Sequence, residues 1–323
     1  MTAVAICVGT VGSGAWTSTD GGESWRRAGR GLGNESRLYG LAAHPSKPGV
    51  LFAGAEDGLY QSTDGGKSFE HIASPMDGMD VWKIVFDPSD PDTMFAGTRP
   101  AALFRSNDGG RQWRRLPVDM VEECPNVGVP RVTSLAVDPA DRRIVWAGIE
   151  VDGVRRSLDG GETWTRISGG LDDPDIHDVA ARPAGDGKSV LTSTPREIFA
   201  SADKGESWQR LGVGAHFALP YCRGLALKAD DPNTVFVATG DGAAGTTGAI
   251  QRSKDAGKSW QRVSLPATPN SPIWAFATHT ADPGLIVACS HYGELYASHD
   301  AGDSWKKLPR EFTEIRALAW TPN

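Results

Sequence analysis

The sequence contains few cysteines and lacks the short motifs that mark common catalytic, metal and cofactor sites. Its four cysteines, Cys7, Cys124, Cys222 and Cys289, lie far apart without a Cys-x-x-Cys pair, so neither a zinc site nor a disulfide framework is indicated. It has no Gly-x-Ser-x-Gly elbow, phosphate-binding loop or dinucleotide-binding motif. We therefore expect no cofactor and no metal site.

Excess positive charge and long apolar runs are also missing. The 323 residues include 33 Lys and Arg against 40 Asp and Glu, a net charge of −7 at pH 7, which argues against a nucleic-acid partner. No apolar run approaches the ~18 residues that a membrane span needs. The segment from Met1 to Cys7 has no basic region followed by a long apolar one. We therefore expect a cytoplasmic monomer that binds neither nucleic acid nor membranes.

What the sequence does contain is abundant glycine and a repeated eight-residue motif. The 39 glycines and 21 prolines suit many short strands joined by tight turns. The motif Ser-x-Asp-x-Gly-x-(Ser/Thr/Gln)-(Trp/Phe) occurs at 18–25, 62–69, 106–113, 157–164, 201–208, 253–260 and 298–305. Successive copies begin 44, 44, 51, 44, 52 and 45 residues apart, and a period of this length along the whole chain indicates a propeller or a solenoid.

Each position of the motif has a role in building a turn. Glycine allows positive φ, the aspartate carboxylate can accept hydrogen bonds from nearby backbone N–H groups, and the aromatic residue can bury a large apolar area between units. Because the aspartate recurs in all seven copies, we interpret it as structural and not catalytic.

The motif resembles the Asp-box, or BNR, repeat of sialidase-like and other β-propeller proteins, and the resemblance covers all seven units. Sialidases, however, are six-bladed and carry a Phe-Arg-Ile-Pro segment that this sequence lacks. The xyloglucanase-type glycoside hydrolases pair two seven-bladed Asp-box propellers around a substrate cleft, whereas this chain has one. In size and blade number it is most similar to the photosystem II assembly and stability factors, which bind partners and have no known catalytic activity.

Each unit is predicted to hold four short strands, as at 37–45, 50–54, 59–62 and 68–72 in the second unit. The chain begins with three expected strands over 3–27 and ends with a lone strand over 314–320. Joined, these form a seventh blade and remove the exposed edges of an open array. We predict an all-β, seven-bladed β-propeller over residues 1–323, closed by one C-terminal and three N-terminal strands.

Alignment of the seven innermost strands places two rings of side chains at one end of the channel. The outer ring, four residues before the apolar centre of each strand, is Arg37, Asp80, Arg131, Asp175, Tyr221, Pro272 and Glu314. The inner ring, two residues before that centre, is Tyr39, Trp82, Thr133, His177, Arg223, Trp274 and Arg316. Side chains two apart on a strand share a face, so the rings should be stacked. The two longest loops, 118–130 and 241–248, are expected on the same face.

The residue types in these rings suggest both binding and catalysis. Arginine forks suit carboxylates and phosphates, and indole rings can stack on a sugar. The predicted ligand-binding residues are Arg37, Tyr39, Trp82, Arg131, Arg223, Trp274, Arg316 and His291. Groups able to transfer protons are the predicted catalytic residues, namely Asp80, Asp175, His177, Tyr221 and Glu314. Alternatively, the alternating arginines and aspartates of the outer ring form a structural collar of ion pairs.

Two functions remain open at this point. One is binding of a small anionic or carbohydrate-like molecule at the channel mouth, with hydrolase or lyase chemistry as an extension. The other is a non-catalytic platform that binds a protein partner on the same face. The first predicts an open pocket with unpaired arginines, and the second predicts a flat or sealed mouth. The fold cannot choose between them, because propellers serve both functions.

Overall fold

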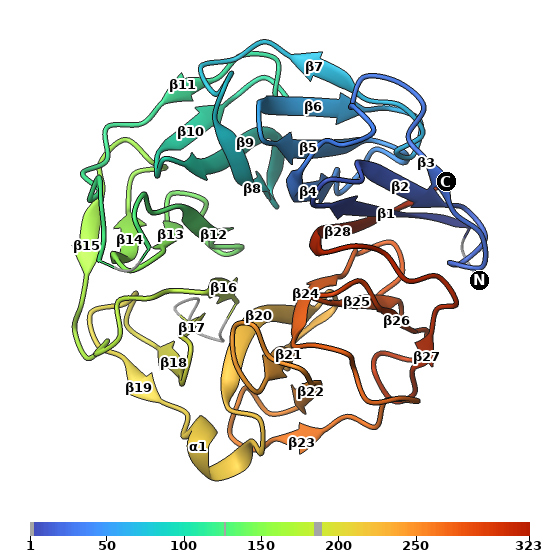
Figure 1. Ribbon diagram of the computed structural model, residues 1–323. Helices are drawn as coiled ribbons and strands as arrows, with labels where there is room; N and C mark the ends of the chain where they lie inside the picture. Colours follow the sequence, from blue (N-terminus) through green and yellow to red (C-terminus); the bar gives the residue numbers. More distant parts are fainter. Residues whose placement is uncertain (1–2, 126, 184–188) are drawn as a thin grey trace.

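Seven four-stranded antiparallel sheets are arranged as a ring around a central channel (Figure 1). The computed structural model describes residues 3–125, 127–183 and 189–323. These residues form 28 strands and a single short helix, α1 (Val213–His216). The predicted all-β, seven-bladed propeller is therefore confirmed.

The blades are named here in chain order, with the strands of each given from the channel outward. Blade 1 contains β28 (Ile315–Pro322), β1 (Val4–Thr10), β2 (Ala15–Ser18) and β3 (Arg26–Arg27). Blade 2 contains β4 (Leu38–Ala43), β5 (Leu51–Ala55), β6 (Gly58–Ser62) and β7 (Glu70–Ile72). Blade 3 contains β8 (Asp80–Asp87), β9 (Asp90–Arg99), β10 (Leu103–Ser106) and β11 (Arg114–Arg115).

The remaining blades follow the same plan. Blade 4 contains β12 (Val132–Val137), β13 (Val145–Ile149), β14 (Gly153–Ser157) and β15 (Thr165–Ile167). Blade 5 contains β16 (Asp178–Arg182), β17 (Ser189–Ser193), β18 (Ile198–Ser201) and β19 (Gln209–Arg210). Blade 6 contains β20 (Tyr221–Lys228), β21 (Asp231–Gly240), β22 (Gly248–Ser253) and β23 (Gln261–Arg262). Blade 7 contains β24 (Ile273–Ala277), β25 (Ile286–Ser290), β26 (Leu295–Ser298) and β27 (Lys306–Lys307).

In blade 1, strands from the two ends of the chain pair with each other. β28 runs antiparallel to β1 from Val4–Pro322 to Thr10–Ile315, and the Asn323 N–H donates to the Ala3 carbonyl at 2.9 Å. This pairing covers the inner edge of β1, which would otherwise present unpaired backbone groups.

Apolar side chains fill the spaces between adjacent blades. Phe52 of blade 2, for example, belongs to one buried cluster with Val81 and Met94 of blade 3. The aromatic residue of the motif enters these clusters, as Trp113 does beside Phe52 and Trp208 does beside Trp146 of the preceding blade. Burial of these large rings joins each blade to its neighbour, as the sequence motif predicts.

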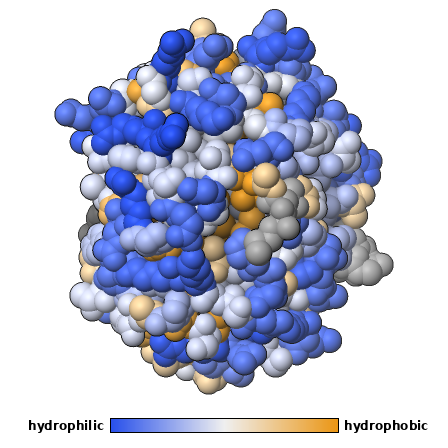
Figure 2. All heavy atoms as spheres, turned by 90° about the vertical axis from the view of Figure 1, so that its right-hand side faces the viewer, coloured by the Kyte–Doolittle hydropathy of each residue, from blue (hydrophilic) through white to orange (hydrophobic). Residues whose placement is uncertain are grey.

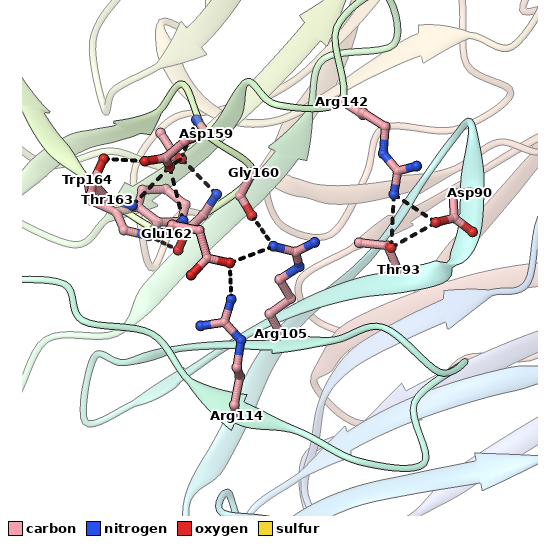
Figure 3. A network of polar contacts seen from close by, with 12 residues as sticks. Asp90, Thr93, Arg105, Arg114, Arg142, Asp159, Gly160, Glu162, Thr163 and Trp164 are labelled. Carbon is pink, nitrogen blue, oxygen red and sulfur yellow. Dashed lines mark hydrogen bonds and ion pairs between the residues drawn. The ribbon is translucent and has the colours of Figure 1, made fainter.

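The motif itself folds into a turn held by its own side chains (Figure 3). In blade 4, the Ser157 hydroxyl donates to Asp159 at 2.7 Å and accepts from the backbone N–H of Gly161 at 2.7 Å. Asp159 also accepts from the Thr163 hydroxyl at 2.6 Å and from the Thr163 N–H at 2.9 Å. These hydrogen bonds lower the pKa of Asp159 to about 2, and the bond from the Thr163 hydroxyl has the largest effect. The carboxylate is thus committed to the turn, in agreement with its structural interpretation.

A second repeated contact joins neighbouring blades through arginines that directly precede the motif serine. Arg105 Nη1 donates to the carbonyl of Gly160 in the next blade at 2.8 Å and lies 3.1 Å from the Glu162 carboxylate (Figure 3). The equivalent contacts are Arg156 with Lys204 O and Glu206, and Arg252 with Ala301 O and Asp303. These three arginine contacts link adjacent blades of the ring. They involve none of the residues predicted at the channel mouth.

The side of the ring near the chain termini is covered mainly by hydrophilic residues (Figure 2). The short outer strands β3 and β27 contribute charged side chains at this edge. Within the ranges given above, no helix has the length and apolar character needed to cross a membrane.

Candidate functional site

The channel mouth is shaped by β-bulges in the innermost strands. In six of these strands the backbone pairing skips one residue, or two in β20, near the mouth. The skipped residues include Tyr39, Trp82, Thr133, Arg223, Trp274 and Arg316. A bulge bends the strand and redirects side chains. As a result, the skipped residues line the cavity, and so do their successors in each of these strands except β12.

A cavity of about 280 Å³ occupies the channel and is lined by all seven innermost strands. All seven members of the predicted inner ring contribute to its wall, namely Tyr39, Trp82, Thr133, His177, Arg223, Trp274 and Arg316. Of the outer ring, Arg131 also lines it. Arg37, Asp80, Asp175, Tyr221, His291 and Glu314, which the sequence also suggests as site residues, lie outside its wall. The structure therefore brings the inner ring together around one cavity, and of the outer ring only Arg131 lines that cavity among the described residues.

The two indoles of the inner ring are covered by other side chains. Tyr39 stacks on Trp82 with ring centroids 4.3 Å apart, and the Arg131 guanidinium lies 4.1 Å from the Trp82 centroid. His291 stacks in the same way on Trp274 at 4.3 Å, with the Arg223 guanidinium 3.9 Å from that centroid. Trp82 is 7% and Trp274 9% exposed. Neither ring has a face free for a sugar, so the indoles position arginines and do not form the predicted stacking platform.

The outer ring does not form a collar of ion pairs between neighbouring arginines and aspartates. Arg37 pairs with Glu56 at 3.8 Å, and Arg131 pairs with Glu150 at 2.7 Å. Both partners come from the loop after the second strand of the same blade, so the pairs lie within blades. Asp80 has no ion pair within 4.0 Å among the described residues. Burial raises the pKa of Asp80, with the charge of Arg99 acting in the opposite direction.

Arg316 at the mouth also has its own carboxylate. Its Nε contacts Glu314, and Nε2 of His291 lies 3.2 Å from the same Glu314 oxygen. The His291 imidazole is the largest influence, and together with Arg316 it lowers the pKa of Glu314 from 4.5 to about 2 despite burial. Glu314 is thus held as an anion, so of the two proton-transfer roles, donor and acceptor, it is poorly suited to that of a donor.

Arg223 differs from these two arginines. It is 8% exposed, and no carboxylate lies within 4.0 Å of its guanidinium in the part of the chain that the structure describes. Its charge helps to lower the pKa of both Arg131 and Arg316, for which burial is the main cause. Arg223 is therefore a buried cation that repels these two arginines and has no direct carboxylate partner among the described residues, although its charge also acts on Asp175 and Asp178.

His177, Asp175 and Tyr221 form a small polar group beside Arg223. Nδ1 of His177 lies 2.7 Å from the Cys222 carbonyl oxygen, and its Nε2 lies 3.4 Å from Asp175. Burial, followed by the charge of Arg223, lowers the pKa of His177, so the neutral imidazole is favoured. Tyr221 packs edge-on against His177 at 5.4 Å, and burial raises its phenol pKa. Although burial acts to raise the pKa of Asp175, the His177 contact lowers it overall.

Two charged residues of the cavity wall, Lys83 and Asp178, were not among the predicted site residues. Each directly follows an inner-ring residue, Trp82 or His177, and strict alternation along a strand would place it on the opposite face. In β8 the bulge at Trp82 removes this alternation and brings Lys83 to the channel. The sequence already set Lys83 apart, because the equivalent positions of the other five bulged strands hold small residues, namely Gly40, Ser134, Gly224, Ala275 and Ala317.

The Glu314 contacts predict a pH-dependent contribution to stability. Because the pKa of Glu314 falls from 4.5 to about 2 on folding, its stabilising effect is present above pH 4.5 and is lost as the pH falls toward 2. Glu314→Gln should unfold at a lower temperature than the wild type at neutral pH, and the gap should close across this acidic range. Thermal unfolding of both proteins against pH measures this directly; a gap that stays constant below pH 4.5 would contradict it.

Comparison with curated proteins finds relatives of two kinds, although no family model matches the chain. It is 26% identical over 255 residues to a probable oligoxyloglucan-reducing end-specific xyloglucanase of Neosartorya fischeri, with 71% of this chain and 27% of the relative covered. It is 24% identical over 325 residues to an oligoxyloglucan-reducing end-specific xyloglucanase of Emericella nidulans, with 84% and 40% covered. The chain thus spans 27% to 40% of the length of these two xyloglucanases. It is 25% identical over 277 residues to the photosystem II assembly lipoprotein Ycf48 of a Synechococcus species, with 80% and 72% covered.

Solved structures give the same two groups. The GH74 enzyme of Niastella koreensis superposes with a TM-score of 0.68 at 18% identity, covering 84% of this chain and 45% of that one. YCF48 bound to a D1 peptide superposes with a TM-score of 0.56 at 13% identity, covering 86% of each chain. At these identities the structural likeness supports the propeller fold and does not assign a function.

Proposed function

We propose that this protein binds a small anionic molecule at the mouth of its central channel. The observation that carries the proposal is Arg223, a guanidinium that is 8% exposed, lines the cavity and has no carboxylate within 4.0 Å among the described residues. Burying an unpaired charge is unfavourable, and in water-excluded sites it is normally compensated by a counter-ion. A ligand carboxylate or phosphate would supply that counter-ion and could accept two parallel hydrogen bonds from the guanidinium fork.

The geometry favours an anion over a neutral sugar. Xyloglucanases are among the relatives, but Trp82 and Trp274 are covered and cannot stack on a sugar ring in this arrangement. A sugar acid remains compatible, because its carboxylate would bind Arg223. Hydrolase or lyase chemistry is an extension of the proposal in which Asp80 donates a proton, since burial raises its pKa.

A second candidate function is recognition of a protein partner through an acidic group at the same mouth. The similar propeller YCF48 has been solved with a D1 peptide, and it matches this chain over 86% of each. In that case a peptide carboxylate would occupy the position next to Arg223. Both candidates require Arg223, and they differ in the size of the ligand.

Thermal unfolding with a panel of ligands at constant ionic strength tests the proposal. The panel contains acetate, sulfate, phosphate, succinate and glucuronate, with glucose as the neutral control. A ligand present at ~100 times its dissociation constant adds about 2.7 kcal/mol to the free energy of unfolding. We expect at least one anion to stabilise the wild type and Arg26→Gln equally, because Arg26 is exposed on β3, and to leave Arg223→Gln unchanged.

The opposite outcomes are equally clear. Equal shifts in all three proteins would indicate general salt effects and would argue against a site at Arg223. Absence of any shift with small anions, together with binding of an acidic peptide by the wild type, would favour the protein-partner function.

A further inference from the structure

Lys83 is a second cation beside the cavity that has no direct ion pair with any of the described residues. It is partly buried on β8, directly after the bulge at Trp82, and it lines the cavity wall. No carboxylate of the described residues lies within 4.0 Å of its ammonium group. Unlike a lysine on the outer surface, it cannot be fully surrounded by bulk water, and its charge is directed at an enclosed space.

Asp178 is the carboxylate that the described cavity wall contains, and it is already engaged. One of its oxygens accepts from the backbone N–H of Val179 at 2.9 Å, and the other accepts from the N–H of Leu225 at 2.9 Å. These bonds tie the side chain to β16 and to the neighbouring β20. Burial raises the pKa of Asp178, and the charge of Lys83 acts against that rise, but no ion pair forms between them.

Among the described residues, two cations of the cavity wall therefore have no carboxylate within 4.0 Å. The cations that line the cavity are Lys83, Arg131, Arg223 and Arg316. Arg131 is paired with Glu150 and Arg316 with Glu314, so Lys83 and Arg223 remain. Their strands, β8 and β20, are separated by β12 and β16 and lie on opposite sides of the channel in Figure 1.

We infer that the ligand is a small dianion, with one anionic group bound by Arg223 at the mouth and the second bound by Lys83 across the channel. This inference rests on the proposed function and adds the chemical class of the ligand. The two cations suit the two ends differently, because the guanidinium fork fixes the orientation of a planar carboxylate while the ammonium acts as a mobile point charge. The cavity of about 280 Å³ is at or below the range of pockets for drug-sized ligands, about 300–1,000 Å³, so a short molecule fits.

A length series of dicarboxylates tests this arrangement. The probes are malonate, succinate, glutarate and adipate, each compared at neutral pH with its monoamide, which has nearly the same shape and one charge less. Dissociation constants are measured by calorimetry for the wild type, Lys83→Met and Lys83→Arg. Lys258→Met serves as the matched control, because Lys258 is an exposed lysine in the motif turn of blade 6.

We expect one chain length to bind best to the wild type and to bind about tenfold or more tightly than its monoamide, since a tenfold change corresponds to 1.4 kcal/mol. Lys83→Met should bind the diacid and the monoamide equally, whereas Lys83→Arg and Lys258→Met should keep the preference. If Lys83→Met does not fold, the inference is still tested by Lys83→Arg, which conserves the charge, and by the comparison of each diacid with its monoamide in the wild type.

The outcomes separate this inference from the proposed function. If the wild type binds diacids and monoamides equally well through Arg223, the proposed function stands and the dianion inference is wrong. The same conclusion follows if Lys83→Met retains the preference. If the wild type binds none of the probes, the dianion inference is wrong, and the small-anion function is then decided by the panel of sulfate, phosphate, acetate and glucuronate.

Discussion

Replacing Arg131 with glutamine is expected to lower the free energy of unfolding by about 3 kcal/mol, the loss typical of a buried ion pair that is left with one partner. Arg131 and Glu150 lie 2.7 Å apart with side chains 14% and 13% exposed. Glutamine would leave the Glu150 charge buried without its partner, and it would also remove the guanidinium that lies 4.1 Å from the Trp82 centroid. Equilibrium unfolding in urea, with the slope and the midpoint both recorded, measures the difference.

Arg37→Gln is the matched control for this experiment. Arg37 also pairs with a glutamate of its own blade, but at 3.8 Å and with side chains 61% and 38% exposed. Exposed pairs of this kind contribute about 0–1 kcal/mol, so the variant should unfold close to the wild type. Similar losses for the two variants would show that burial of the Arg131 pair is not what gives it its strength.

Replacing Arg223 with glutamine, unlike replacing Arg131, is expected to affect stabilisation by an anion and not to lower the stability of the ligand-free protein. Without ligand, the free energy of unfolding should stay equal to that of the wild type or rise. Removal of the unpaired cation relieves its desolvation and its repulsion of Arg131 and Arg316, which offsets the loss of a cation–π contact worth about 1–2 kcal/mol. With a stabilising anion at ~100 times its dissociation constant, the variant should lack the added 2.7 kcal/mol of the wild type.

The measurement is a pair of urea titrations, with and without the anion that gives the largest shift in the ligand panel. A residue retained for ligand binding at the expense of stability behaves in this way. If Arg223→Gln instead loses as much stability as Arg131→Gln in the absence of ligand, Arg223 is a structural residue. The anion site would then have to be abandoned.

Much of the fold could be predicted from the sequence because the motif repeats. The spacing of its seven copies gives the number of blades, and the strand runs at 3–27 and 314–320 correspond to β1–β3 and β28 of blade 1. The role of the motif aspartate also follows from its repetition, and the Asp159 hydrogen bonds agree with it. These features depend on local turn chemistry and on strand order, which a sequence records directly.

The site could be predicted only in part, because it depends on contacts between blades. The inner-ring residues were identifiable from their position on each strand, and the structure brings them together. What covers Trp82 was not identifiable, since Tyr39 and Arg131 come from different blades. The predicted collar of ion pairs between blades was wrong for a similar reason. Arg37 and Arg131 pair instead with Glu56 and Glu150, which lie in the same blades as these arginines.

Lys83 shows a different limit of reading a strand from its sequence. A period of two predicts that Trp82 and Lys83 point to opposite faces, whereas the bulge between Val81 and Lys83 places both beside the channel. The signal available in the sequence was a lysine at a position that holds a small residue in most of the other innermost strands.

The most direct test of the anion site is a crystal soaked in selenate, because the anomalous scattering of selenium locates the anion. We predict a peak inside the channel mouth within hydrogen-bond distance of the Arg223 guanidinium in the wild type, and no peak there in Arg223→Gln. Peaks confined to exposed arginines such as Arg26, with an empty channel mouth in the wild type, would contradict the assignment of Arg223 as a ligand-binding residue.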